Sequence, residues 1–164
     1  MNIDQEKALL FLNQFSVLIR KVLDFSSLKA ISIEEELEFL DLYISIENQR
    51  FQNSIQLIKE IKCDDEILLP PLLIQPLIEN AIIYGLRSDS GEMRIDFSIL
   101  EVDNQLRIEI KNELNMNTTK NHSFQSKSTE IIQKRLALYD SSASFKTVIQ
   151  NQFFIASIVL PINE

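Results

Sequence analysis

Glycine is scarce in this chain of 164 residues, which contains only Gly85 and Gly91. Phosphate-binding loops of the GxGxxG and GxxxxGK[ST] types need several glycines at fixed spacing, so both loops are excluded in their standard form. Cys63 is the single cysteine and His122 the single histidine. One cysteine excludes an intrachain disulfide framework and a cysteine-rich zinc site. One histidine leaves no spare candidate for a Ser-His-Asp triad.

Long hydrophobic runs and an excess of positive charge are also missing. No run of about 18 apolar residues occurs, and the richest apolar stretch, residues 67–78 (ILLPPLLIQPLI), is broken by three prolines. No basic leader precedes an apolar core, so we expect no signal peptide and a cytoplasmic location. The net charge of −8 argues against nucleic acid or an anionic membrane surface as a partner. A few basic groups and a metal ion would still allow nucleotide binding.

Hydrophobic residues make up 45% of the chain, which is enough for a packed core. Their spacing is helical in some segments and alternates in others. The spacing predicts helices over residues 4–25, 32–51 and 128–140, and one from Pro70 to about Leu86, kinked at Pro76. It predicts strands over residues 54–62, 93–102, 105–112, 144–150 and 152–162. The expected fold is α+β, with helices on one face of a mixed, mostly antiparallel sheet.

Two local signals and one long polar segment complete this prediction. Ser32 followed by Glu35 matches a capping box at a helix start. Asp103–Asn104 between two alternating segments predicts a two-residue hairpin. Residues 113–127 are polar and lack periodicity, which predicts a long loop of the kind that is often functional.

A carboxylate and an amide interrupt the apolar segment at residues 74–86 (IQPLIENAIIYGL). Ionised side chains are rarely buried without a partner. Neighbouring residues lie about 100° apart around a helix, so Glu79 and Asn80 can both lie along the edge of one face. From this pattern alone, a solvated helix rim and a functional site are equally compatible with the sequence.

Three segments resemble the LytS/YehU type of bacterial sensor histidine kinase. Residues 31–51 (ISIEEELEFLDLYISIENQRF) are similar to the family's pattern SLEEEL…YL.IE..RF. Residues 68–86 (LLPPLLIQPLIENAIIYGL) are similar to P.LLLQPLVENAIKHG, and residues 135–140 (RLALYD) to the later R-L segment. The resemblance runs from about residue 5 to the C-terminus.

The resemblance implies a GHKL (Bergerat) ATP-binding domain over residues 31–164, a two-layer α/β sandwich. It implies that residues 1–30 are the C-terminal helix of a dimerisation and phosphotransfer element. The implied cofactors are ATP and Mg²⁺. The implied partners are a second copy of the chain and a response regulator of the LytTR type, with any membrane anchor in segments outside the chain.

In such kinases the Glu-Asn pair belongs to the N box. The resemblance implies that Asn80 coordinates the Mg²⁺ that bridges the ATP phosphates, and that Glu79 polarises the histidine that attacks the γ-phosphate. Phosphoryl transfer needs this positioning and charge neutralisation. The family's acceptor motif, NPHFLFN, is absent, and His122 lies where the family has its ATP lid. The acceptor histidine is therefore expected outside the chain.

Other positions depart from the family pattern. Ile83 and Tyr84 replace Lys and His, and Tyr84 is either a neighbour of the nucleotide or a packed surface aromatic. The strand that ends in KNELN aligns with D-x-G-x-G so that Lys111 falls at the Asp that receives the adenine amino group. Lysine only donates hydrogen bonds, which leaves Asn112 as the nucleotide-binding candidate there.

The segment before RLALYD lacks the family's glycines, and Ser128 and Thr129 stand in their place. Both could offer backbone N–H groups to phosphates at a helix N-terminus. Lys134 and Arg135 are candidates to reach a phosphate, or they form an ordinary basic helix face. Two functions stay open: an ATP-dependent histidine protein kinase, or a degenerate kinase-like module with weak or no ATP binding that acts as a dimerisation and signalling scaffold. The Glu79–Asn80 pair within a match over nearly the whole chain favours the first, while the missing glycines and Lys111 motivate the second.

Overall fold

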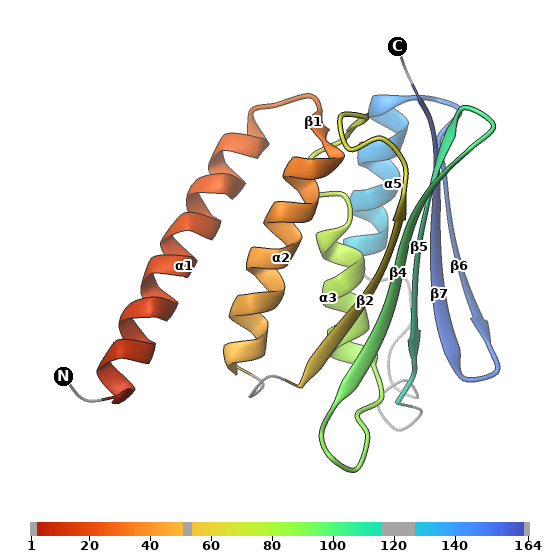
Figure 1. The fold of residues 1–164 in the computed structure, drawn as a ribbon. Helices are drawn as coiled ribbons and strands as arrows, with labels where there is room; N and C mark the ends of the chain where they lie inside the picture. Colours follow the sequence, from red (N-terminus) through yellow and green to blue (C-terminus); the bar gives the residue numbers. More distant parts are fainter. Residues whose placement is uncertain (1–2, 51–53, 116–126, 163–164) are drawn as a thin grey trace.

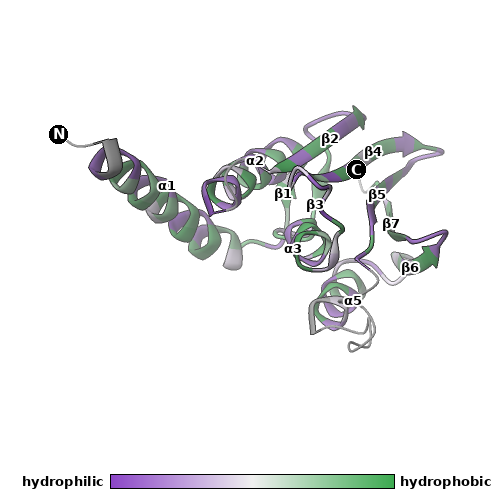
Figure 2. Ribbon diagram, turned by 90° about the horizontal axis from the view of Figure 1, so that it is seen from below, coloured by the Kyte–Doolittle hydropathy of each residue, from purple (hydrophilic) through white to green (hydrophobic). Residues whose placement is uncertain are grey.

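A layer of helices covers one face of a twisted sheet in the computed structural model, which describes residues 3–50, 54–115 and 127–162 (Figure 1). The helices are α1 (Ile3–Ser26), α2 (Ile33–Arg50), α3 (Gln75–Tyr84) and α5 (Lys127–Tyr139). The strands are β1 (Ile31–Ser32), β2 (Ile55–Lys62), β3 (Leu68–Leu69), β4 (Met93–Val102), β5 (Gln105–Glu113), β6 (Ser144–Gln150) and β7 (Phe153–Pro161). The predicted α+β fold with helices on one face is confirmed (Figure 2).

The main sheet has five strands in the order β2-β4-β5-β7-β6. β2 pairs in parallel with β4, and the other three pairs are antiparallel. The predicted hairpin at Asp103–Asn104 is confirmed, because both residues have positive φ, 53° and 59°, as a two-residue hairpin turn of type I′ requires. Asn151 and Gln152 make the second such turn, with φ of 51° and 67°.

Apolar side chains alternate along the strands and fill the space between the sheet and the helices. On β5, Leu106, Ile108 and Ile110 are each at most 1% exposed, and the residues between them are more exposed. This period of two follows from the pleat of a strand. The inner face of β5 is therefore continuous with the core that the helices cover.

The predicted start of the second helix is confirmed. The backbone N–H of Ser32 donates to Glu35 Oε2 at 2.9 Å, and the Glu35 N–H donates to Ser32 Oγ at 3.1 Å. These reciprocal bonds are a capping box. The 64–67 turn lies beside this helix start, where the Glu34 N–H donates to the Asp65 carbonyl oxygen at 3.0 Å.

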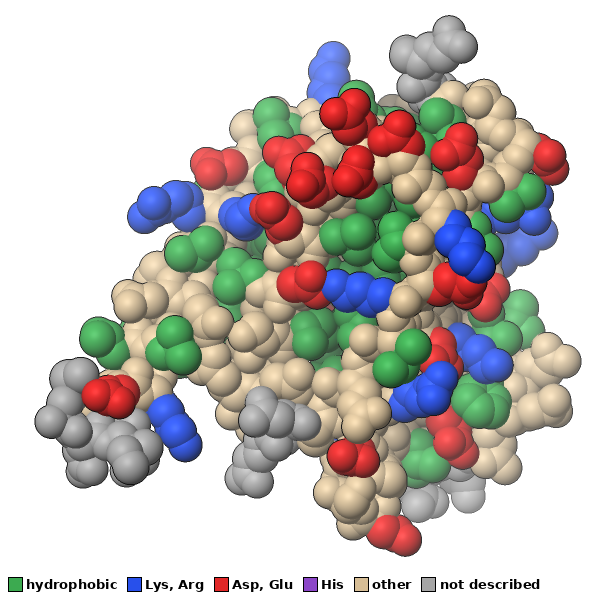
Figure 3. Space-filling view, viewed as in Figure 1, with side chains coloured by type: hydrophobic (Ala, Val, Ile, Leu, Met, Phe, Trp, Pro, Cys, Tyr) green, Lys and Arg blue, Asp and Glu red, His purple; other side chains and the backbone are tan. Residues whose placement is uncertain are grey.

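Acidic side chains gather at this end of the molecule, as the upper part of Figure 3 shows. The first turn of α2 carries Glu34, Glu35 and Glu36, and the neighbouring turn adds Asp64 and Asp65. Carboxylates near a helix N-terminus are favoured by the helix dipole. The negative charge thus lies at the end of α2 that is far from the C-terminal end of α3.

The predicted course of the third helix was wrong at its start. The helix begins at Gln75 and not at Pro70, so Pro76 lies in the first turn and produces no kink. Proline is tolerated in a first turn because the N–H that it lacks has no helical partner there. Leu72 has φ of 55°, a left-handed conformation that no α-helix continues through. Residues 70–74 are therefore a turn that leads into α3.

Helix α1 packs against α2 along one side only. Its Gln14 Nε2 donates to Ser45 Oγ at 3.0 Å, and Lys21 Nζ lies 3.2 Å from Glu38 Oε2. Its other side exposes large apolar side chains: Leu9, Leu10, Leu12, Phe15, Val17, Ile19 and Leu23. Across the described residues, no helix combines the length and the apolar character needed to cross a bilayer.

Candidate functional site

The C-terminal end of α3 is fastened to the end of β5. The Leu86 N–H donates to the Glu113 carbonyl oxygen at 2.8 Å, and the Asn115 N–H donates to the Tyr84 carbonyl oxygen at 3.0 Å. Gly85 forms an isolated antiparallel bridge with Leu114 between these two bonds. Two segments that are distant in the chain are thereby held side by side, and both carry predicted site residues.

Gly85 is one of the two glycines, and it stands where a side chain would prevent this junction. A Cβ placed there would clash with the Ala81 carbonyl oxygen and lie 3.0 Å from Met93 Cε. The backbone angles of Gly85, φ −68° and ψ 150°, are open to any residue. Glycine is therefore favoured by the close approach of the Ala81 carbonyl oxygen of α3, with Met93 of β4 beside it, and not by its conformational freedom.

The side-chain amide of Asn112 on β5 is buried, and only one of its two polar atoms makes a hydrogen bond among the described residues. Its side chain faces the helices and is 2% exposed. Its Nδ2 donates to the Glu113 carbonyl oxygen at 3.1 Å, while its Oδ1 is buried without a hydrogen-bond partner among the described residues. Ile95 and Phe154 flank it in register on the neighbouring strands. Buried polar atoms are nearly always bonded, so this oxygen is a candidate acceptor for a donor from outside the described residues.

Lys111 and Asn112 lie on opposite faces of this strand. Lys111 lies between the buried Ile110 and Asn112, so it points to the opposite face of the sheet. Its ammonium lies 4.7 Å from the ring centroid of Phe153. The inward position at the end of the strand belongs to Asn112, whose amide oxygen can accept a hydrogen bond from an amine, as a lysine cannot.

The structure separates the Glu79–Asn80 pair. Asn80 is 8% exposed and lies among the buried residues of α3, which include Leu77, Ile78 and Ala81. Glu79 is exposed. A solvated helix rim therefore describes Glu79 but not Asn80. Asn80 is one turn from Tyr84, the half-buried residue whose carbonyl oxygen meets the end of β5.

Glu79 acts electrostatically on α2. Burial raises the pKa of the Tyr43 hydroxyl above its usual value, and the negative charges of Glu47 and Glu79 raise this pKa further, while Arg50 opposes them. Glu47 is 8% exposed and accepts from Arg50 Nη1 at 3.1 Å. The sequence reasoning did not name Tyr43, Glu47 or Arg50 as site residues, although all three belong to the family pattern YL.IE..RF.

Two further candidates lie at the start of α5. Thr129 is half-buried in the first turn of this helix. The side chain of Ser128 and the whole of His122 lie outside the described residues. Figure 1 shows α3 and α5 side by side, and they run in opposite directions. The first turn of α5 thus faces the same end of the molecule as the last turn of α3.

Lys134 lies on the exposed face of α5. Its side chain is exposed, and Ile132 and Leu136, two residues before and after it, are buried. A helical residue two positions from both members of a buried pair points away from them. Lys134 therefore belongs to the outer face of α5, and its binding of a phosphate stays a prediction.

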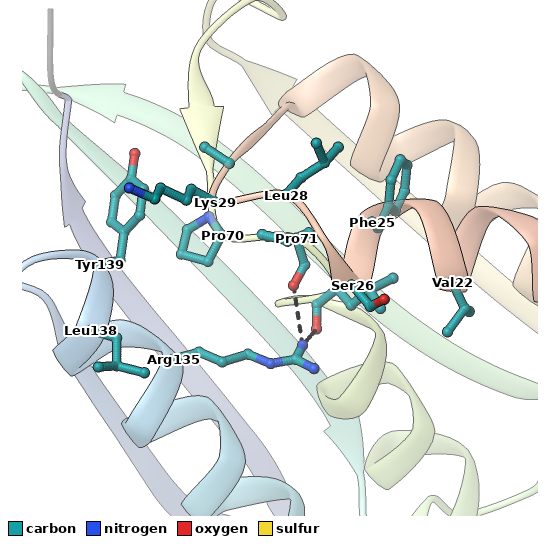
Figure 4. A pocket seen from close by; sticks show the side chains of 12 residues that line it. Val22, Phe25, Ser26, Leu28, Lys29, Pro70, Pro71, Arg135, Leu138 and Tyr139 are labelled. Carbon is teal, nitrogen blue, oxygen red and sulfur yellow. Dashed lines mark hydrogen bonds between the residues drawn. The ribbon is translucent and has the colours of Figure 1, made fainter.

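The side chain of Arg135 is hydrogen-bonded to the turn before α3. Its Nη1 donates to the Pro71 carbonyl oxygen at 3.1 Å and also to the Leu72 carbonyl oxygen (Figure 4). Both acceptors belong to the turn before α3, at the opposite end of that helix from Tyr84. The guanidinium of Arg135 thus stabilises this turn, and its contact with a phosphate stays a prediction.

An apolar cavity lies at this same far end. It has a volume of about 800 Å³ and is lined largely by apolar side chains of α1, the 70–72 turn and α5, among them Phe25, Pro70 and Leu138 (Figure 4). It contains neither Asn80 nor Asn112. This cavity is distinct from the place where the buried amides meet the end of α3.

The donor atoms at the candidate site suit a nucleotide better than a bare metal ion. No group of three or more His, Cys, Asp or Glu side chains in the described part of the chain could hold a metal. Mg²⁺ prefers oxygen ligands and is usually bound by one or two side chains together with substrate phosphates. The amide oxygen of Asn80 fits that role, and the unpaired Oδ1 of Asn112 fits an amino group of a base.

Comparison with known proteins relates the chain to kinases of one type. A family model described as "Histidine kinase" matches residues 1–55. The sensor histidine kinase YpdA of Escherichia coli is 32% identical over 111 residues, which are 68% of this chain and 19% of that protein. The sensor protein LytS of Oceanobacillus iheyensis is 33% identical over 111 residues, which are 66% of this chain and 19% of that protein. The chain thus spans about a fifth of the length of these curated relatives.

Solved structures show the same fold at low identity. The catalytic domain of the histidine kinase ThkA superposes with a TM-score of 0.60 at 9% identity, over 81% of this chain and 95% of that one. The histidine kinase domain of a blue-light activated kinase from Erythrobacter litoralis superposes with a TM-score of 0.56 at 15% identity, over 80% of this chain and 62% of that one. ThkA in complex with the response regulator TrrA superposes with a TM-score of 0.54 at 10% identity, over 93% of this chain and 48% of that one.

Proposed function

The chain belongs to the LytS-type family of sensor histidine kinases, and from this premise we propose that it binds ATP with Mg²⁺ and phosphorylates a histidine located outside the chain. Residues 31–164 form the ATP-binding catalytic domain in this proposal. Residues 1–30 form the C-terminal helix of the dimerisation and phosphotransfer element. The product would be relayed to a response regulator, for which the sequence predicts the LytTR type.

The observation that carries the proposal is the unpaired Oδ1 of Asn112, 2% exposed on the inner face of β5. Leaving a buried acceptor unbonded costs about 1–3 kcal/mol. An exocyclic amino group, such as that of adenine, would satisfy it. Because Nδ2 is held by the Glu113 carbonyl oxygen, the atom offered to a ligand is an acceptor. That orientation favours adenine over guanine, whose corresponding group is a carbonyl oxygen.

The proposal assigns roles to the remaining site residues, and their positions support these roles. Asn80, buried one turn before the end of α3, would offer its amide oxygen to the cation. Mg²⁺ would neutralise the charge that develops on the phosphates during transfer. Glu79, exposed beside it, would orient an incoming histidine by accepting its N–H. Thr129 and the first backbone N–H groups of α5 would lie near the phosphates.

Two features support the proposed partners. The outer side of α1 exposes a row of large apolar side chains, including Leu9, Leu12 and Leu23, and such a stripe is typical of helices that pair with another helix. A second copy of the chain would cover it. The structural neighbour ThkA was solved with its response regulator TrrA, which supports a response regulator as the downstream partner.

Calorimetric titration tests the nucleotide proposal. The chain is titrated with a non-hydrolysable ATP analogue and with the matching GTP analogue, each with Mg²⁺. We expect binding of the adenine analogue and at least about tenfold weaker binding of the guanine analogue, because one unsatisfied buried polar contact costs about 1–3 kcal/mol. The absence of heat at millimolar adenine analogue would refute the proposal.

A second candidate function is a kinase-like scaffold with weak or no nucleotide binding. The observation that favours it concerns the two predicted phosphate-binding cations: Arg135 is bonded to the Pro71 carbonyl oxygen, and Lys134 lies on the exposed face of α5. The scarcity of glycine points the same way. Under this alternative, Asn80→Ala leaves signalling in cells unchanged, whereas loss of signalling supports the kinase.

A further inference from the structure

Glu36 is a buried carboxylate whose place in the fold the proposed chemistry does not explain. It lies in the first turn of α2 and is 1% exposed. Its Oε2 accepts from the Leu72 N–H at 2.8 Å, and its Oε1 accepts from the Ile74 N–H at 2.9 Å. Both donors belong to the turn that leads into α3. One side chain of α2 thus holds the segment that starts the helix bearing Asn80.

The same turn is held from its other side by α5. Arg135 donates to the carbonyl oxygens of Pro71 and Leu72. Glu36 thus accepts hydrogen bonds from the N–H groups of the turn, and Arg135 donates to its carbonyl groups. Leu72 is kept in a left-handed conformation, with φ of 55°, which is unfavourable for leucine and persists only when the surroundings impose it. The turn therefore has a conformation that these two side chains determine.

The start of α3 depends on Glu36 for a second reason. The residue before the helix, Ile74, makes no side-chain cap, and the first N–H groups of a helix need partners from outside it. The Glu36 carboxylate supplies one such partner, and a negative charge is favoured near the positive end of the helix dipole. α3 continues without interruption from Gln75 to Tyr84, so a shift at its start moves its whole length.

We propose that Glu36 is a positioning residue: its carboxylate ties α2 to the 70–74 turn and thereby sets where α3 presents Glu79 and Asn80. α2 follows α1 directly through the short β1 segment. A displacement of α1 and α2 would therefore reach the N-box helix through this side chain. The inference rests on the proposed function for its catalytic meaning, but the geometric link can be tested by itself.

The nucleotide test uses the complete chain with Glu36→Gln, which keeps the size of the side chain but turns an amide N–H toward the donors of the turn. The affinity for the ATP analogue is measured with Mg²⁺ and again in EDTA. We expect a loss of roughly tenfold or more with Mg²⁺, as is typical for a group that orients a metal ligand. In EDTA we expect less than about a twofold change, because Asn112 lies on β5 and not on α3.

Two further variants separate positioning from folding. Glu36→Asp keeps the charge and should recover part of the Mg²⁺-dependent affinity. Glu35→Gln makes the same exchange of carboxylate for amide one residue earlier, where glutamine can still accept the capping-box bond. It does not touch the 70–74 turn and should leave both affinities unchanged. Equal losses with Mg²⁺ and in EDTA for Glu36→Gln, or the same pattern in Glu35→Gln, would overturn the proposal.

Amide hydrogen exchange tests the link without any ligand. In Glu36→Gln, the amides of residues 77–84 should exchange at least about tenfold faster than in the wild type, while those of β4 and β5 stay unchanged. Unchanged exchange in α3 overturns the proposal. If the wild-type chain binds no nucleotide, the proposed function fails, and the exchange result alone decides whether Glu36 positions α3.

Discussion

Replacing Asn112 by leucine should stabilise the fold and remove nucleotide binding at the same time. The side chain is 2% exposed, and its Oδ1 has no partner among the described residues. Removing that buried acceptor should gain about 1–3 kcal/mol, and losing the bond from Nδ2 to the Glu113 carbonyl oxygen should cost about 1 kcal/mol. Leucine shares the branched shape of asparagine and would pack between Ile95 and Phe154.

The expected net change is an increase of about 1 kcal/mol in the free energy of unfolding. For a chain of this size, that corresponds to a rise of roughly 2–4 °C in Tm. Guanidinium denaturation gives the free energy of unfolding, and calorimetric titration of the same preparation gives the affinity for the ATP analogue. A gain in stability combined with a loss of affinity is the signature of a residue kept for binding.

The same substitution at Asn48 is the matched control. Asn48 is half-buried, and both of its amide atoms are bonded to Ile55, at 2.8 Å and 3.1 Å. Asn48→Leu should destabilise the fold by about 1–3 kcal/mol, because it leaves two backbone groups unpaired. If Asn112→Leu destabilises the fold as much as Asn48→Leu and leaves the nucleotide affinity unchanged, the reasoning is refuted.

Three other predictions concern the frame around the site. Burial raises the pKa of Glu36 from 4.5 to about 7, against the lowering effects of the backbone N–H donors of the 70–74 turn and of the Arg135 charge. Between these two pH values the folded chain therefore holds a proton that the unfolded chain has lost. Stability from this group is present below about pH 4.5 and is lost as the pH rises through 7. Glu36→Gln should therefore flatten the fall in unfolding free energy between about pH 5 and 8, and an unchanged slope would contradict this. Gly85→Ala should lower the unfolding free energy by roughly 1–3 kcal/mol, since its Cβ would lie 3.0 Å from Met93 Cε and against the helix backbone; a wild-type denaturation curve would count against it. Leu23→Glu on the exposed side of α1 should lower the fraction of dimer that light scattering measures across a concentration series. The denaturation midpoint of the monomer should not change. An unchanged dimer fraction would show that this side of α1 is not the dimer contact.

The parts of the fold that depend on neighbouring residues were predictable from the sequence. The hairpin at Asp103–Asn104 and the capping box of Ser32 and Glu35 each need only residues that are close in the chain. The alternation of apolar residues likewise predicted the strands and the helix-covered sheet. Pro76 misled the prediction because a proline in a first turn and a proline at a kink look alike in sequence.

Site residues were harder to predict, because their roles depend on contacts across the fold. The sheet face of Lys111 and Asn112 depends on a register that a shift of one residue inverts. Arg135 bonds to carbonyl groups of a turn far earlier in the chain, and no local pattern indicates such a partner. Glu36 directly follows two exposed acidic residues of the same type, Glu34 and Glu35, and only the structure shows that it is buried.

The central claim is that Asn80 meets the cation and Asn112 meets the base of one bound nucleotide. Nuclear magnetic resonance of the ¹⁵N-labelled chain tests it directly, with Mn²⁺ replacing Mg²⁺ as a paramagnetic probe in the presence of the ATP analogue. The account predicts that Mn²⁺ broadens the side-chain amide signals of Asn80, while those of Asn112 shift on nucleotide binding in the diamagnetic Mg²⁺ sample. Saturating nucleotide that leaves both side-chain signals unmoved, or broadening centred on another part of the chain, would contradict it.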